Sequence, residues 1–194
     1  MLFRSNNSMG FRPRYVLKSD LEMVPCLDLL GHRTPNCFVR RGSSNVQGEL
    51  DALGAMVSGL APGDAAVIFP EGSRANPAKR ERELARLAER HPERHARLGS
   101  LQRLIPPKPA GAQAILGAAP AADVITVWHE GLDGLDTFPG MLRALSERRV
   151  TAHVVVTLHP RAEVPSGDGF TEWIDRRWVE MDDAVARFAQ APGV

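Results

Sequence analysis

The chain has 194 residues, of which 43% are hydrophobic and 24% charged, the size and composition of one globular domain. A net charge of +1 excludes a strong overall field that would select nucleic acid, so no nucleic-acid partner is expected. No run of about 18 apolar residues could span a membrane, and the first ten residues have no apolar core typical of a secretory signal. We expect a cytoplasmic protein whose only membrane contact would be peripheral.

The two cysteines, Cys26 and Cys37, have no spacing typical of metal ligands, so no metal site is expected. We expect reduced, partly buried thiols, with a bridge between them as the alternative.

The first part of the chain predicts a strand–helix–strand order. Residues 1–14 are polar and predict an irregular arm in front of a single folded domain over 15–194. Apolar runs and helical periodicity predict the following elements: a strand over 15–17, a turn into a helix that ends near residue 31, a strand over 36–41, a helix over 44–60 and a strand over 65–69. This order predicts parallel strands joined by a right-handed crossover.

The second part begins with a highly charged stretch over 77–101, which Pro92 interrupts. Leu84 and Leu87 give it a narrow apolar stripe, typical of a solvated insertion; a basic face resting on anionic lipid is the alternative, which its many glutamates disfavour. Further patterns predict a helix over 110–119, a strand over 123–128, a short helix over 137–146, a strand over 150–158 and a helix over 170–190. The fold class predicted is α/β, with a mostly parallel central sheet flanked by helices.

The stretch Ala65–Arg74 is the most informative part of the sequence. Its apolar run ends at Pro70 and is followed by Glu71, Gly72, Ser73 and Arg74. In a parallel sheet such a turn lies at the carboxyl edge of the strands, where ligands bind. Glycine allows close approach of the backbone, and arginine beside a carboxylate suits a ligand that carries phosphate and hydroxyl groups.

The hexapeptide Phe69–Arg74, FPEGSR, resembles the third sequence block of the glycerolipid acyltransferases of the lysophosphatidate (1-acyl-sn-glycerol-3-phosphate) acyltransferase type. Two further stretches resemble that family in the family's order. The segment from Lys18 to Arg41 resembles the second block, a lysine-led helix followed by a strand that ends in arginine. Ile105-Pro106-Pro107 resembles the fourth block, with a second proline where the family has an apolar residue.

The resemblance implies a glycerol-3-phosphate acyltransferase-like fold and a role in phospholipid synthesis. The reaction would move a fatty acyl group from acyl-CoA or an acyl carrier protein, as co-substrate rather than bound cofactor, to a hydroxyl of lysophosphatidate or a glycerol phosphate. The residues implied to bind the acceptor are Arg41, Glu71, Gly72, Ser73 and Arg74. Pro70 and Pro106 are implied to shape the acyl site.

The family's first block, His-x4-Asp, supplies the general base, and this sequence lacks it. None of the six histidines has an aspartate five positions later, and no histidine precedes Lys18. His129 follows a predicted strand near Glu130, but it is expected to be structural, as are His153 and His159. No catalytic residue is therefore identified.

Two interpretations follow from the missing base. The chain is an acyltransferase whose start was placed too late or whose catalytic segment was removed, or it is a non-catalytic homologue that binds a phospholipid or an acyl carrier. A phosphatase or a nucleotide-binding domain is disfavoured, because the sequence has no glycine-rich phosphate loop and no cluster of metal-binding carboxylates.

Overall fold

The protein has an α/β fold, as the sequence predicts, and its contacts divide it into two units. The computed structural model describes residues 12–23, 33, 35–40, 45–73, 75–132, 135, 138–147 and 150–190. The first unit comprises residues 1–73 and 108–122, and the second comprises residues 74–107 and 123–194.

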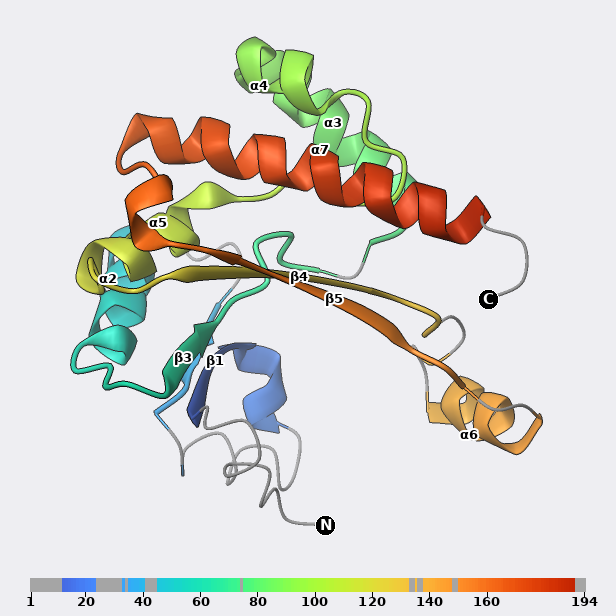
Figure 1. The fold of residues 1–194 in the computed structure, drawn as a ribbon, viewed down its shortest axis with the longest axis horizontal. Helices are drawn as coiled ribbons and strands as arrows, with labels where there is room; N and C mark the ends of the chain where they lie inside the picture. The colour runs from blue at the N-terminus through green and yellow to red at the C-terminus, as the bar shows by residue number, and fades with distance from the viewer. Residues whose placement is uncertain are drawn as a thin grey trace. The chain divides into compact units, whose positions relative to one another are not determined.

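In the part of the first unit that the structure describes, a three-stranded parallel sheet of order β2-β1-β3 is accompanied by the helices α2 and α5 (Figure 1). Its elements are β1 (Arg12–Lys18), η2 (Ser19–Met23), β2 (Cys37–Val39), α2 (Val46–Val57), β3 (Asp64–Val67) and α5 (Pro109–Ala118). The predicted strand–helix–strand order is thus confirmed as a parallel arrangement, in which α2 connects the two strands that flank β1. Cys26 lies outside the described residues.

The core of this unit forms between the sheet and its helices. Asn45 caps α2 by accepting a hydrogen bond from the amide of Gly48 at 3.0 Å. The predicted apolar face of α2 is confirmed, because its apolar residues recur at helical spacing toward the strands. The buried members of this core are Cys37, Leu53, Met56, Val57 and Ile115.

Strand β1 begins at Arg12, so the irregular arm expected over residues 1–14 is wrong for its last three residues. The cause is Asp64, whose carboxylate accepts a bond from Nε of Arg12 at 2.5 Å and one from Nη2 of Arg14 at 2.9 Å. Arg12 pairs with Asp64 in the β1–β3 register, so polar contacts extend the strand beyond its apolar part. Arg14 also donates to the carbonyl oxygen of Met56 at the end of α2.

The second unit consists of a two-stranded antiparallel sheet and a set of helices. Its elements are α3 (Pro77–Arg90), α4 (Pro92–Leu98), β4 (Val124–Glu130), α6 (Phe138–Glu147), β5 (His153–His159), η3 (Arg161–Glu163) and α7 (Asp168–Gln190). The sequence predicted these strands as part of one mostly parallel sheet. Among the described strands they instead form a separate antiparallel pair, with Val127 opposite Val156.

Helix α7 lies between α4 and the β4–β5 pair (Figure 1). Its predicted apolar face is confirmed: Trp173, Ile174, Trp178, Met181 and Val185 are buried. Phe188, half-buried, contacts the ring of Trp128 edge-on at a centroid distance of 6.2 Å.

Two buried aspartates also lie in α7, which the apolar periodicity did not predict. Asp175 accepts hydrogen bonds from the guanidinium groups of Arg94 and Arg97 of α4. Asp182 accepts from the backbone amides of residues 102, 103 and 104, each at 2.7 Å. The charged stretch over 77–101 is therefore only partly solvated, because two of its arginines point inward.

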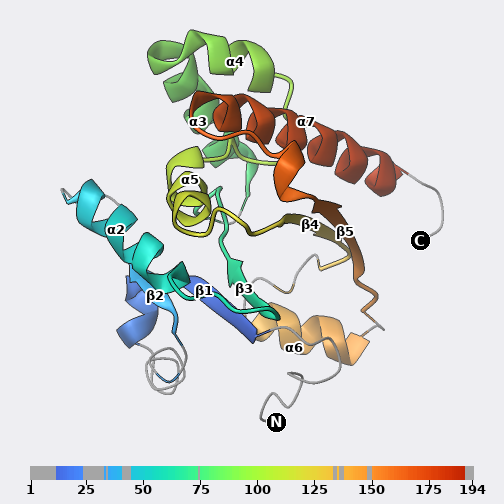
Figure 2. The same cartoon turned by 60° about the vertical axis from the view of Figure 1, so that its left-hand side comes forward.

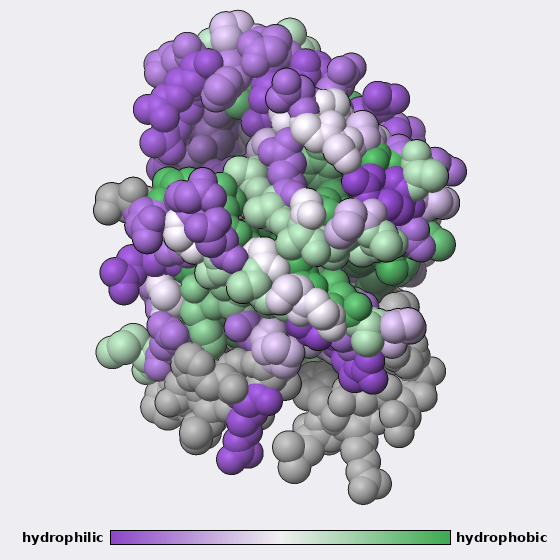
Figure 3. All heavy atoms as spheres, turned by 90° about the vertical axis from the view of Figure 1, so that its left-hand side faces the viewer, coloured by the Kyte–Doolittle hydropathy of each residue, from purple (hydrophilic) through white to green (hydrophobic). Residues whose placement is uncertain are grey.

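Most of the remaining charged residues of this stretch are exposed to solvent. In Figure 3 the helices α3 and α4, at the top of the view, present a largely hydrophilic surface. Pro77 is at the first turn of α3 and Asn76 caps it, while α4 begins anew at Pro92.

The ion pairs of Asp64 predict a pH dependence of stability. Its pKa is lowered to about 2, first by the hydrogen bond from the Ala61 amide and then by that from Arg12. Because the folded pKa lies below the ordinary value of 3.8, the stabilisation is present above that value and is lost as the pH falls through about 2. Asp64→Asn should therefore lower the melting temperature at neutral pH, and its deficit from wild type should shrink in acid. Circular dichroism melts at several pH values measure both; a deficit that does not change with pH would contradict the assignment.

The buried Asp175 predicts a large difference between two ion pairs. Asp175→Asn removes the partner of Arg94 and Arg97 in the interior and should lower the free energy of unfolding by about 3 kcal/mol. Glu147→Gln breaks the exposed Arg143–Glu147 pair of α6 and should change it by about 0.5 kcal/mol or less. Urea unfolding of both variants measures the contrast; equal losses would show that burial does not set the strength of the Asp175 contacts.

Candidate substrate-binding loop

The parallel sheet of the first unit brings the ends of its strands to one edge. Lys18 is the last residue of β1 and pairs in register with Val39, the last residue of β2, while Val67 ends β3 beside Tyr15. The turn that follows β3 therefore lies at the same edge as Lys18 and Arg40. At this edge the Lys18 ammonium forms an ion pair with Asp20.

The turn after β3 is a closed loop that depends on Gly72. The amide of Gly72 donates to the carbonyl oxygen of Phe69 at 2.9 Å. Its backbone has φ of 67°, a region that side-chain-bearing residues rarely adopt. Phe69 is 67% exposed, whereas Pro70, Glu71 and Ser73 are half-buried. The loop thus presents its backbone and an aromatic ring at the edge of the sheet.

Lys108 lies against this loop and was not among the residues selected from the sequence. Its amide donates to the carbonyl oxygen of Pro70 at 3.0 Å, which fixes the start of α5 to the turn. Its ammonium nitrogen lies 4.0 Å from the point where a β-carbon on Gly72 would be. The side chain is exposed, and no carboxylate of the described residues forms an ion pair with it. It supplies a positive charge at the loop.

The structure describes some of the implied site residues and not others. Pro70, Glu71, Gly72 and Ser73 lie together in the loop. Arg41 and Arg74 lie outside the described residues. The structure does describe Arg40, the residue before Arg41. Its amide donates to both carboxylate oxygens of Glu49, at 3.1 and 3.2 Å, and this connects the end of β2 to α2.

Pro106 belongs to the second unit, where it is buried. The residues around it are fixed by polar contacts, since Asp182 binds the amides before it and Nη2 of Arg94 donates to the Pro107 carbonyl at 2.9 Å. Its role in an acyl site stays a prediction.

The described histidines all belong to the second unit, at positions 91, 95, 129, 153 and 159. His159 is buried, with Nε2 3.0 Å from Oγ1 of Thr126 and its ring edge-on to Trp173. Burial, followed by the nearby Arg177, lowers the pKa of His159. His153 packs against Phe188 at a ring distance of 4.6 Å. Both rings thus pack against aromatic residues of α7, and the structural roles expected for them stay predictions.

The described residues contain no group of three or more His, Cys, Asp and Glu side chains placed to hold a metal ion. Over the same part of the chain, every helix is too short or too polar to cross a bilayer. Comparisons with family models, with characterised proteins and with solved structures found no match to this chain.

The conformation of Gly72 predicts the effect of a single methyl group. Gly72→Ala places a side chain in the left-handed region and should lower the free energy of unfolding by about 1 kcal/mol. Gly117→Ala is the matched control, because Gly117 is helical and a β-carbon there would meet nothing within 4 Å. It should leave stability unchanged or raise it slightly. Urea unfolding of the two variants tests this contrast, and a Gly72→Ala protein as stable as wild type would contradict the loop geometry.

Proposed function

We propose that this protein is an acyltransferase of the glycerolipid type, which transfers a fatty acyl group from an acyl-thioester to a hydroxyl of lysophosphatidate or a related glycerol phosphate. The observation that carries the proposal is the Phe69–Ser73 loop at the carboxyl edge of a parallel sheet, with the Lys108 ammonium beside Gly72. The resemblance of FPEGSR to the acyltransferase block supplies the reaction class.

The chemistry of the loop suits a phosphorylated acceptor. A lysine ammonium is a compact positive charge with three donors, and phosphate oxygens are strong acceptors. Glycine without a side chain lets a ligand reach the backbone beside that charge. In this proposal Lys108 holds the phosphate together with Arg41 and Arg74, and Glu71 accepts a hydrogen bond from a glycerol hydroxyl. Because such acceptors reside in membranes, the proposal includes peripheral contact with the membrane surface.

The reaction itself needs a base. The acceptor oxygen attacks the thioester carbonyl carbon, the new C–O bond forms, the C–S bond breaks, and the hydroxyl proton passes through the base to the departing sulfur. The five described histidines belong to the second unit, and none has an aspartate five positions later. This observation favours a second candidate, a homologue that binds the phosphorylated lipid without turnover.

A binding experiment tests the site independently of catalysis. The full chain is titrated with lysophosphatidate and with the monoacylglycerol of the same acyl chain, which lacks the phosphate. Lys108→Gln should weaken lysophosphatidate binding by about tenfold, the value of one charge-assisted contact, and leave monoacylglycerol binding unchanged. Lys79→Gln, a lysine of α3 in the second unit, is the control and should bind like wild type.

Turnover distinguishes the two candidates. Release of free thiol from acyl-CoA that depends on lysophosphatidate supports the acyltransferase, and phosphate-dependent binding without thiol release supports the binding homologue. A wild-type chain that binds lysophosphatidate no better than monoacylglycerol would contradict both.

A further inference from the structure

The β4–β5 pair has two different faces. Side chains alternate along each strand, and residues directly opposite each other in the register share a face. One face packs on α7 through Trp128, His153 and His159, each of which contacts an aromatic ring of that helix. Figure 2 shows α7 along one side of the two strands. The opposite face, called the outer face below, consists of Ile125, Val127, His129, Val154, Val156 and Leu158.

The outer face is apolar although it is exposed. The exposed fraction of its five aliphatic residues runs from 43% for Ile125 to 61% for Val156. An antiparallel sheet with one covered face usually carries its polar residues on the other. Here Thr126, Glu130 and Thr157 lie on the α7 side instead, so the outer face is the more apolar of the two. Its aliphatic groups leave about 400 Å² in one patch, a size typical of a surface that another molecule covers.

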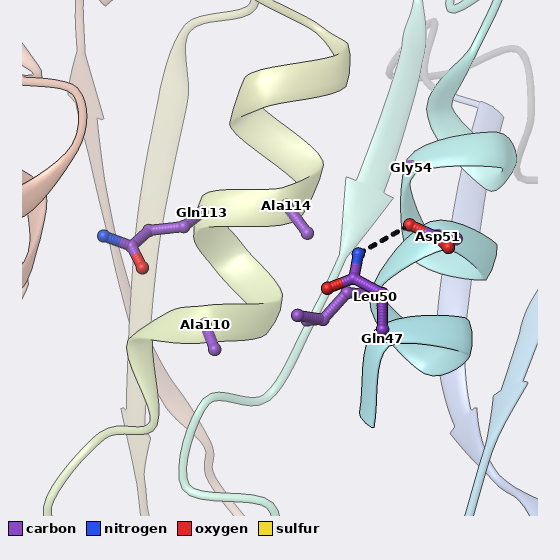
Figure 4. A pocket seen from close by; sticks show the side chains of 7 residues that line it. All are labelled: Gln47, Leu50, Asp51, Gly54, Ala110, Gln113 and Ala114. Carbon is purple, nitrogen blue, oxygen red and sulfur yellow. Dashed lines mark hydrogen bonds between the residues drawn. The ribbon is translucent and has the colours of Figure 1, made fainter. Parts of the chain in front are cut away.

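The groove between α2 and α5 of the first unit offers no comparable surface (Figure 4). Its two exposed polar side chains satisfy each other, because Gln47 donates to Oδ1 of Asp51 at 2.8 Å. Gly54, Ala110 and Ala114 supply much of the remaining lining, and such small residues add little apolar area. The outer face of β4–β5 is therefore the better candidate for a binding surface.

The chemistry of the outer face limits what can cover it. It carries no carboxylate, ammonium or guanidinium group, and its one titratable side chain is His129. Segments that lie on anionic membranes combine Lys or Arg with Trp or Phe, and the outer face has none of these residue types. A charged protein surface would lose hydration there without gaining an ion pair. The fitting occupant is a flat, uncharged surface of branched aliphatic side chains, and the same face of a second copy is such a surface.

We propose that two copies of this chain associate through their outer faces. Two sheets that pack face to face lie about 10 Å apart, with the side chains of both inner faces interdigitated. Val127 and Val156 form the central pair of the β4–β5 register. In a two-fold dimer the central pairs of both copies meet near the axis, and α7 covers the far side of each sheet. The inference does not depend on the proposed acyl transfer.

The area of the outer face predicts a weak dimer. Two such patches with their rims bury roughly 1,000 Å² in total, at the lower limit of specific interfaces. We therefore expect a dissociation constant of about 10 μM rather than a nanomolar one. Dilution should separate the copies, so protein concentration is the variable of the test.

Sedimentation velocity of the full chain, from about 1 to about 200 μM, spans the expected constant. The wild type should change from monomer to dimer over this range. Val156→Lys places two like charges at the centre of the interface and should weaken the dimer by about 100-fold or more. Val46→Lys is the matched control: Val46 of α2 is also 61% exposed and lies outside the outer face, so this variant should dimerise like wild type.

A mixture of two variants tests whether the outer faces meet directly. Val156→Glu alone should be monomeric for the same reason as Val156→Lys. An equimolar mixture of the two places opposite charges at the axis and should recover dimers that neither variant forms alone. Absence of dimers in the mixture, or homodimers of either variant at the wild-type strength, would overturn the face-to-face arrangement.

Other occupants give distinct results. A wild type that stays monomeric over the whole range would overturn the proposal. If Val156→Lys melts well below wild type in samples dilute enough to be monomeric, the outer face is already covered within one chain, which would also overturn it. Binding of a monomeric wild type to phosphatidylcholine vesicles, lost in Val156→Lys, would assign the outer face to lipid instead.

Discussion

The three hydrogen bonds that Asp182 accepts from consecutive backbone amides are the constraint on which the second unit depends. A carboxylate buried in the apolar face of a helix is costly unless its lone pairs are satisfied. Here one side chain satisfies the backbone of residues 102–104, which has no helix or strand of its own to do so. Asp175, two turns earlier in α7, is likewise satisfied, because it accepts hydrogen bonds from the guanidinium groups of Arg94 and Arg97. The charged insertion is thereby joined to the long C-terminal helix by buried polar contacts.

Polar contacts also fix the proline-containing segment that follows the insertion, at residues 104–107. The Arg94 guanidinium bridges Asp175 and the Pro107 carbonyl, so the backbone at Pro107 is fixed to α7 within the second unit. Within the first unit, the Lys108 amide is bonded to the Pro70 carbonyl. The backbone at Lys108 is thus fixed locally by its own hydrogen bond, which is what a binding side chain on a loop requires.

The sequence predicted most elements because their signals are local. Apolar periodicity placed α2 and α7 within a few residues, and the predicted interruption at Pro92 is where α3 ends and α4 begins. Pairing is different: the antiparallel β4–β5 arrangement depends on the connection over 131–152, whose length and composition do not determine the direction of the second strand. The strand start at Arg12 and the inward arginines depend on aspartates about 50 and 80 positions away, so no local pattern contains them.

In the candidate site, too, the features with a local sequence signal were predicted and those set by distant contacts were not. Gly72 lies in the turn that proline and glycine after an apolar run predicted, and its φ of 67° is a detail that the prediction did not contain. Lys108 was missed because nothing in Pro107-Lys108-Pro109 indicates its neighbour; only the hydrogen bond to Pro70, across 38 positions of sequence, brings it there.

The buried thiol of Cys37 has a consequence for how the first unit can be followed in solution. Burial, and secondarily the charge of Glu49, raise its pKa, so the nucleophilic thiolate is scarce at neutral pH and the sulfur is shielded by Met56, Val57 and their neighbours. Alkylating reagents and peroxide reach such a sulfur only when the core around it opens. The rate at which Cys37 is alkylated is therefore a direct chemical measure of how often β2 separates from α2.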